Sequence, residues 1–105
     1  MANTTKYFLH GRLSAKQGQG ETLRALLLEA AAAMPSVKGC IIYAISKDSA
    51  DPESVWITEV WDTKEDHDNS LKLESVRAII SQAMPVIDGM PQKGQELEVL
   101  GGMGI

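Results

Sequence analysis

The sequence predicts an α+β fold in which helices pack against one antiparallel sheet. Three observations carry this prediction. Short runs of alternating apolar and polar residues open and close the chain, a long stretch of strong helix formers follows the first run, and two adjacent strand-like runs precede a second helical region. The predicted order of elements is therefore β-α-β-β-α-β.

The first strand is predicted over residues 6–14, KYFLHGRLS, where the side chains alternate. One face carries Tyr7, Leu9 and Leu13, and the other carries Phe8, His10 and Arg12. Residues 15–20, AKQGQG, form a glycine-rich turn. Strong helix formers fill residues 21–34, and Pro35 ends that helix because the residue before a proline disfavours helical backbone angles.

Two strands are predicted next, separated by a polar turn at residues 49–54. Residues 39–48 are almost continuously apolar, which is typical of a strand covered on both faces. Residues 55–61 carry bulky side chains on both faces, with Val55, Ile57, Glu59 and Trp61 on one and Trp56, Thr58 and Val60 on the other. Both faces of this strand are expected to be covered.

Thr63 is predicted to cap a short helix over residues 64–70, and a longer helix is predicted over residues 73–88. Pro85 should kink or shorten the longer helix. The remaining predicted segments are a loop over residues 88–94, a strand over 95–101 and a mobile glycine-rich end over 101–105. The whole order is the split βαβ, or ferredoxin-like, arrangement, in a single domain spanning residues 1–105.

The apolar side chains on both faces of the third predicted strand also indicate a partner. Helices can cover one face of such a sheet, and 105 residues supply no further element for the other. A second copy of the chain is the economical source of that cover. We therefore predict a homodimer packed sheet to sheet.

Composition and charge exclude several classes of function. The net charge of −4 argues against a nucleic-acid partner and against an anionic membrane surface. No segment approaches the length of a membrane span, and the opening residues carry no apolar stretch of signal-peptide length. The single cysteine, Cys40, lies in an apolar run and is expected to be a small buried hydrophobe. We expect a cytoplasmic protein.

Residues 55–70 hold both tryptophans and one of the two histidines of the chain. Within this segment, Glu59 lies in the middle of a strand, and a buried carboxylate needs a partner or an altered pKa. Two interpretations stay open, an ion pair between subunits with a residue such as Arg12 and a role in a pocket. Trp61 either packs the strand against the helix or stacks on a flat ligand.

The two histidines, His67 and His10, are the candidates for a general base near neutral pH. His67 lies in the polar segment KEDHDN, where a solvated surface position is the alternative. His10 lies on the first strand, where a core or interface histidine with a satisfied hydrogen bond is the alternative.

Metal and cofactor motifs are missing from the sequence. Asp66, His67 and Asp68 are consecutive and point in different directions on a helix, and no Cys or His set has zinc spacing. There is no GxSxG motif and no phosphate-cradling GxxxxGK[ST] motif, and residues 18–20, GQG, lack the third glycine of a dinucleotide fingerprint. We expect no metal and no cofactor.

Several short motifs resemble those of the antibiotic biosynthesis monooxygenase family. They are the K-x-G turn that ends at Gly18, the G-C-x-x-Y entry to a strand that ends at Tyr43, and the E-x-W of Glu59 and Trp61 before a charged helix. The resemblance implies a dimeric α+β barrel. It also implies oxidation of a quinol or polycyclic aromatic compound by molecular oxygen, without metal or flavin, after deprotonation of the substrate in a pocket.

The sequence departs from this family at positions that bear on the reaction. Where many relatives carry two histidines in the second helical region, this chain has Ser70 and Ser75. Haem-degrading relatives use an asparagine on the first strand, at a position that here matches Gly11, which disfavours a haem reaction.

The leading hypothesis is a cofactor-independent monooxygenase acting on a small aromatic molecule. His67 or His10 is the expected base, and Trp61 the expected pocket wall. Glu59 or Arg12 is expected to orient the substrate, and further predicted contacts are Tyr43 and Ser70. The loss of the two histidines favours an alternative, a dimeric ligand-binding or regulatory protein without chemistry. A third hypothesis is a purely structural dimer with a vestigial pocket.

Overall fold

The computed structural model describes residues 5–89, 91 and 94–105. Four strands and three α-helices follow one another in the predicted order, and the two longer helices each end in a 3₁₀ turn. The elements are β1 (Lys6–Ser14), α1 (Gly20–Ala33), η1 (Met34–Ser36), β2 (Cys40–Lys47), β3 (Ser54–Trp61), α2 (Lys64–Ser70), α3 (Glu74–Ala83), η2 (Met84–Val86) and β4 (Gln95–Val99). Of the predicted loop over 88–94, residues 90, 92 and 93 lie outside the described part.

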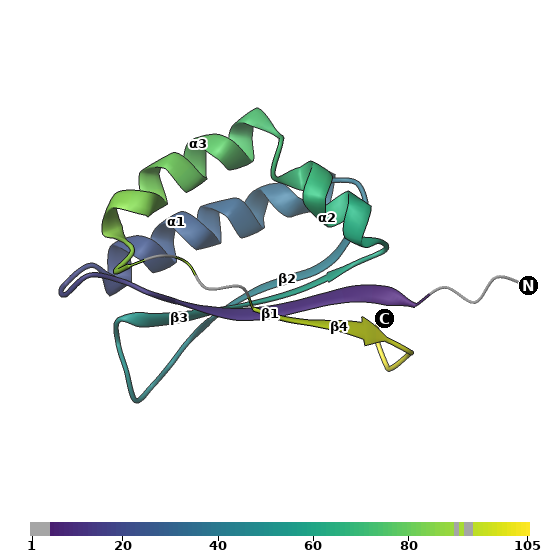
Figure 1. Cartoon of the computed structure of the whole chain (residues 1–105), viewed down its shortest axis with the longest axis horizontal. Coiled ribbons are helices and arrows are strands. Elements are labelled where there is room, and N and C mark those ends of the chain that lie inside the picture. The colour runs from purple at the N-terminus through teal and green to yellow at the C-terminus, as the bar shows by residue number, and fades with distance from the viewer. Residues whose placement is uncertain (1–4, 90, 92–93) are drawn as a thin grey trace, which may run out of the picture.

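The four strands form one antiparallel sheet in the order β2-β3-β1-β4. The helices lie together on one face of this sheet, and no described element covers the opposite face (Figure 1). The prediction of a ferredoxin-like α+β arrangement is confirmed.

Prolines set the ends of both longer helices, as expected from the sequence. Pro35 and Pro85 each lie inside a 3₁₀ turn that follows the last α-helical residue. The predicted helix over 73–88 therefore stops at Ala83, because Pro85 lacks the N–H that continues the helix and its ring clashes with the preceding turn. The predicted cap of α2 is also present, since the Thr63 side chain accepts a hydrogen bond of 3.0 Å from the backbone N–H of Asp66.

Strand register decides which side chains face the helices. Leu9 pairs with Glu59 and Tyr7 pairs with Trp61 across β1 and β3, so these residues share one face of the sheet. Trp61 is fully buried against Met34 and Val76, which places this face under the helices. The alternate residues of both strands point to the uncovered face.

A close approach at Gly39 holds α2 against the start of β2. Gly39 has a φ of +83°, and a Cβ on this residue would collide with the side chain of Asp66 in α2. The backbone carbonyl of Gly39 also accepts a hydrogen bond of 2.8 Å from the N–H of Asp62. The glycine therefore allows α2, and with it His67, to lie directly beside the sheet.

Candidate active site

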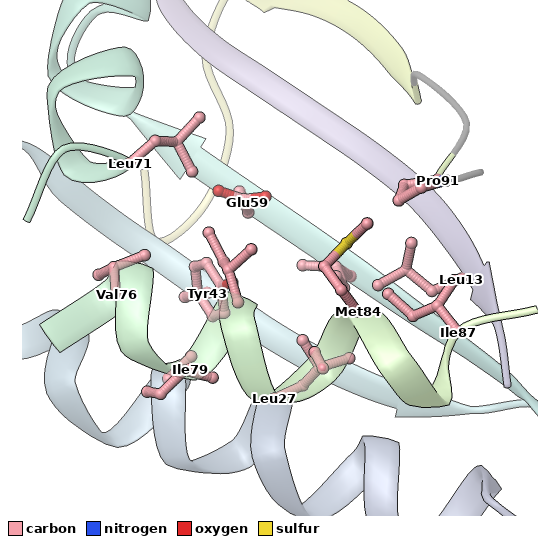
Figure 2. Close-up of a pocket in the computed structure, with 14 residues that line it drawn as sticks. Leu13, Leu27, Tyr43, Glu59, Leu71, Val76, Ile79, Met84, Ile87 and Pro91 are labelled. Atoms are coloured by element: carbon pink, nitrogen blue, oxygen red, sulfur yellow. The ribbon is translucent and has the colours of Figure 1, made fainter. Parts of the chain in front are cut away.

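A cavity of about 250 Å³ lies between the helix-covered face of the sheet and α3 (Figure 2). Its described lining is almost entirely apolar and comes from β1, β2, β3, both longer helices and the segments flanking α3. The lining residues are Leu13, Leu27, Ala30, Tyr43, Ile57, Glu59, Leu71, Val76, Ile79, Ile80, Ala83, Met84, Ile87 and Pro91. Glu59 supplies the carboxylate and Tyr43 the hydroxyl of this lining.

Three of the lining side chains also reach the protein surface. Leu71, Ile80 and Met84 are each at least 40% exposed although they line the cavity. Large apolar side chains exposed next to one another around a hollow are typical of an entrance for an apolar ligand. The cavity is therefore expected to open between α3 and the turn that precedes it.

The Glu59 carboxylate faces the cavity from the middle of β3 (Figure 2). Glu59 is only 8% exposed, and its Oε1 accepts a hydrogen bond of 2.9 Å from Nε1–H of Trp61. No described residue donates a hydrogen bond to Oε2. The carboxylate is thus fixed through one oxygen and has the other available to a ligand.

Burial raises the pKa of Glu59, because removing a carboxylate from water disfavours its charged form. The Trp61 hydrogen bond and the nearby His67 act in the opposite direction and lower it, with the smaller effect. A carboxylate with a raised pKa is a stronger base than an exposed one, which is a property of catalytic carboxylates.

His67 lies behind Glu59, on the side of the carboxylate held by Trp61. Its Nε2 is 3.8 Å from Oε1 of Glu59, and its Nδ1 is 2.9 Å from Oδ1 of Asp68. The imidazole packs with its edge against the Trp61 indole, at 5.8 Å between ring centroids, and beside the Tyr7 ring at 5.3 Å. Only 12% of the His67 side chain is exposed.

Tyr43 supplies the second polar group of the cavity. No described residue forms a hydrogen bond with its hydroxyl. Burial raises the pKa of Tyr43 well above its ordinary value, and the neighbouring Glu59 charge adds to the effect. The phenol therefore stays protonated and can donate a hydrogen bond to a ligand oxygen.

Comparison with known families identifies the chain. The family model described as antibiotic biosynthesis monooxygenase matches residues 6–82. The chain belongs to the antibiotic biosynthesis monooxygenase family. A crystal structure from Chloroflexus aurantiacus J-10-fl, provisionally assigned to this family, is 41% identical, covers 95% of this chain and 98% of its own, and superposes with a TM-score of 0.84.

Two other solved structures extend this comparison. A provisionally assigned antibiotic biosynthesis monooxygenase from Deinococcus radiodurans is 28% identical over 94% of this chain and 95% of its own, with a TM-score of 0.73. The protein PA3566 from Pseudomonas aeruginosa is 19% identical over 96% of this chain and 100% of its own, with a TM-score of 0.83, and shows the shared fold alone. A search of curated proteins found no match.

In this member of the antibiotic biosynthesis monooxygenase family, Glu59 and Tyr43 line the cavity, whereas Trp61, His67 and Ser70 are not among its lining residues. Trp61 is fully buried and reaches the cavity only through its hydrogen bond to Glu59. Ser70 is buried, and its hydroxyl donates to the backbone carbonyl of His67 at 2.6 Å. The predicted tryptophan wall is therefore a support for the carboxylate.

The structure separates His10 and Arg12 from this group. They alternate with Leu9 along β1 and face the uncovered side of the sheet, where His10 stacks on Trp56 at 4.9 Å and lies 2.9 Å from Thr58 Oγ1. Arg12 pairs with Trp56 in register and is exposed. Glu59 and Arg12 lie on opposite faces of the sheet, because side chains alternate along a strand. The ion pair between subunits stays a prediction.

Two contributors to the site were not predicted. Consecutive residues of a helix diverge, yet the Asp68 side chain turns back to Nδ1 of its neighbour His67. Tyr7 comes from β1 and reaches α2 only through the register of the folded sheet. The alternation of β1 placed Tyr7 on the correct face, but sequence offers no signal for the contact itself.

No cluster of three or more His, Cys, Asp or Glu side chains in the described part of the chain is arranged to hold a metal ion. Neither is any of the described helices both long enough and apolar enough to cross a membrane.

The raised pKa of Glu59 predicts how stability depends on pH. Between the ordinary carboxyl pKa of 4.5 and the raised folded value, the folded state binds more protons than the unfolded state, so the free energy of unfolding falls as pH rises. Glu59→Gln, which cannot ionise, should unfold at a higher urea concentration than the wild type at pH 8, and the difference should vanish near pH 4. The exposed Glu65→Gln on α2 is the control. Equal midpoints for wild type and Glu59→Gln at pH 8 would contradict the raised pKa.

Proposed function

We propose that the chain is a cofactor-independent monooxygenase that oxidises a hydroquinone of one or two rings with molecular oxygen. The observation that carries this proposal is the placement of Glu59. A buried carboxylate with a raised pKa faces an apolar cavity and is held from behind by Trp61. The family to which the chain belongs supports the same type of reaction.

The size and charge of the cavity favour this class of substrate. An apolar cavity of roughly 150 Å³ holds a benzene ring, so about 250 Å³ suits one or two fused rings better than three or four. The described lining contains no Lys, Arg or His to balance an anionic group, whereas Glu59 itself is acidic. A neutral aromatic molecule is therefore preferred over a carboxylate or a phosphate.

The two polar groups of the cavity match the two oxygens of a hydroquinone. One ligand hydroxyl donates to Oε2 of Glu59, the carboxylate oxygen without a described hydrogen bond. The other ligand oxygen accepts from the hydroxyl of Tyr43. The remaining ring surface contacts buried aliphatic side chains such as Val76 and Ile79, which exclude water from the reacting atoms.

Glu59 is the general base of the proposed reaction. It takes the proton of the ligand hydroxyl, so the negative charge moves from the carboxylate to the ligand and the net charge of the cavity stays constant. The hydroquinone anion is a stronger reductant than the neutral molecule and gives electrons to oxygen. One ring C–H becomes C–OH, the hydroquinone becomes a quinone, and the second oxygen atom leaves as water. The substrate supplies all four electrons, so no other reductant is needed.

The uncovered face of the sheet supports a homodimer as the working form. Phe8, Trp56 and Leu97 lie on this face by strand register and are partly or largely exposed, although they are large and apolar. A second copy of the sheet would cover them. Light scattering of the purified protein tests this directly, and a molar mass near that of one 11.4 kDa chain would contradict it.

A ligand-binding protein without chemistry is the second candidate. The observation that favours it is Ser70, because family relatives often carry a histidine at this position. The Ser70 hydroxyl donates a hydrogen bond to the backbone carbonyl of His67 and offers no basic group. The cavity, Glu59 and Tyr43 would then serve recognition alone.

Oxygen uptake separates the two candidates. The purified protein is mixed with benzohydroquinone, naphthohydroquinone and anthrahydroquinone, and uptake is compared with autoxidation. We expect uptake with the one-ring and two-ring compounds and transfer of one ¹⁸O atom from labelled oxygen to the product. Saturable quenching of tryptophan fluorescence by the same compounds, with uptake no faster than autoxidation, would establish the binding protein instead.

Replacing Tyr43 by Phe should weaken binding without removing the base. A neutral hydrogen bond contributes about 0.5–1.5 kcal/mol, so we expect the KM for the hydroquinone to rise about 2-fold to 12-fold while kcat changes less. Steady-state oxygen uptake measures both constants. An unchanged KM would place the ligand away from the Tyr43 hydroxyl.

A further inference from the structure

The chain Glu59–His67–Asp68 connects the cavity wall to the protein surface. The Glu59 side chain is 11% exposed and that of His67 is 12% exposed, whereas that of Asp68 is 47% exposed. The carboxyl group that receives the substrate proton in the proposed reaction is therefore enclosed, and it cannot be reset by bulk water from the cavity side while a ligand is bound.

We propose that Glu59 exchanges its proton with solvent through His67, which passes it to Asp68 at the surface. The three side chains lie in sequence, with 3.8 Å between Oε1 of Glu59 and Nε2 of His67 and 2.9 Å between Nδ1 of His67 and Oδ1 of Asp68. The importance of this route for turnover rests on the proposed function, but the route itself is a property of the folded chain.

The tautomer of His67 follows from its contact with Asp68. An ionised carboxylate can only accept a hydrogen bond, so Nδ1 of neutral His67 must carry the proton. Nε2 is then an unprotonated acceptor directed at Glu59. Asp68 is held in the ionised form, because the hydrogen bonds from His67 and from Lys64, whose Nζ is 3.0 Å from Oδ2, lower its pKa.

The charged and titratable groups around His67 come from every element packed against it. Glu59 of β3 and Asp68 of α2 face its two nitrogens, and Lys64 of α2 holds Asp68. Tyr7 of β1 packs on the ring, and its hydroxyl donates to Glu96 of β4 at 2.6 Å. Burial and this hydrogen bond raise the pKa of Tyr7, so the phenol stays neutral beside the imidazole.

The transfer moves only protons, and no group is oxidised or reduced. The O–H bond of the ligand breaks and an O–H bond forms at Oε2 of Glu59. Rotation about the last side-chain torsion of Glu59, which has a broad range, brings the protonated oxygen to the side of the carboxyl that lies 3.8 Å from Nε2 of His67. Nε2 of His67 then takes the proton, the imidazolium is stabilised by Asp68, and the proton on Nδ1 leaves through Asp68 to water.

Nuclear magnetic resonance tests the route without any substrate. Long-range ¹H–¹⁵N correlation of the wild type should show neutral His67 protonated on Nδ1, and protonation on Nε2 would overturn the proposal. In His67→Gln, the midpoint of the ¹³C titration of the Glu59 carboxyl should shift, because the imidazole that interacts with this carboxyl is gone. An unmoved titration would also overturn it. Glu65→Gln is the control that should change neither signal.

Kinetics then test the role in turnover. His67→Ala should lower kcat about 10²-fold with KM changed less than about 2-fold, and added imidazole should restore most of the loss. Imidazole should not rescue Glu59→Gln, which lacks the base itself. Full activity of His67→Ala would overturn the route even if the wild type takes up oxygen. Wild-type protein without uptake but with the Nδ1 tautomer and the moved titration would contradict the proposed function alone.

Discussion

Glu59→Gln is expected to lower kcat for hydroquinone-dependent oxygen uptake about 10²-fold to 10⁴-fold, the range that a positioned general base contributes. Glutamine has nearly the same shape as glutamate, and its side-chain oxygen can still accept the hydrogen bond from Nε1–H of Trp61. The substitution therefore removes the basic group and leaves the cavity wall in place. Oxygen-electrode traces at saturating substrate measure the effect.

The matched control is Glu65→Gln, which makes the same chemical change on an exposed position of α2. It should retain wild-type kcat and KM. Ligand binding by Glu59→Gln, followed through quenching of tryptophan fluorescence, should stay within a few-fold of the wild type. Oxygen uptake by Glu59→Gln at the wild-type rate would contradict the assignment of Glu59 as the base.

Trp61→Ala should be the most destabilising of the site variants. The indole is fully buried and packs against Met34 and Val76, and truncation of a buried Phe or Trp to Ala costs about 3–5 kcal/mol. The variant also leaves Oε1 of Glu59 without its donor, which adds the penalty of a buried unsatisfied acceptor. Urea unfolding followed by far-ultraviolet circular dichroism measures the loss.

Trp61→Phe separates these two contributions. Phenylalanine keeps most of the packing but has no N–H, so this variant should lose about 1–3 kcal/mol, the penalty for an unsatisfied buried group. In the Glu59→Gln background the loss from Trp61→Phe should be smaller, because a neutral amide tolerates the missing donor better. A loss below about 1 kcal/mol for Trp61→Ala would mean that the tryptophan does not support the site.

The order of elements could be predicted from the sequence because each element carries a local signal. Alternation in residues 6–14 and 55–61 marks the strands, and Pro35 and Pro85 mark the ends of the helices. Some boundaries differ from the prediction by a few residues. The helix predicted over 73–88 stops at Ala83, where the proline turn begins.

The candidate site could be predicted only in part, because it depends on contacts between distant residues. Glu59 is singled out as a carboxylate in the middle of a strand and Tyr43 by a motif that resembles the family, and both line the cavity. The roles of Trp61 and His67 depend on which side of Glu59 they occupy, and that follows from how α2 packs on the sheet. Most of the apolar lining residues, such as Leu71 and Met84, cannot be distinguished in the sequence from ordinary core or surface residues.

Strand alternation in β1 and β3 has a consequence for how this chain can change over evolution. Even-numbered and odd-numbered positions of β1 and β3 are under different selection, because their side chains point to different faces of the sheet. Leu9 and Glu59 point toward the helices, whereas His10 and Thr58 point to the uncovered face. Substitutions on one face of the sheet can therefore accumulate without altering the other face. Insertion or deletion of a single residue within either strand would exchange the two sides and is expected to be purged.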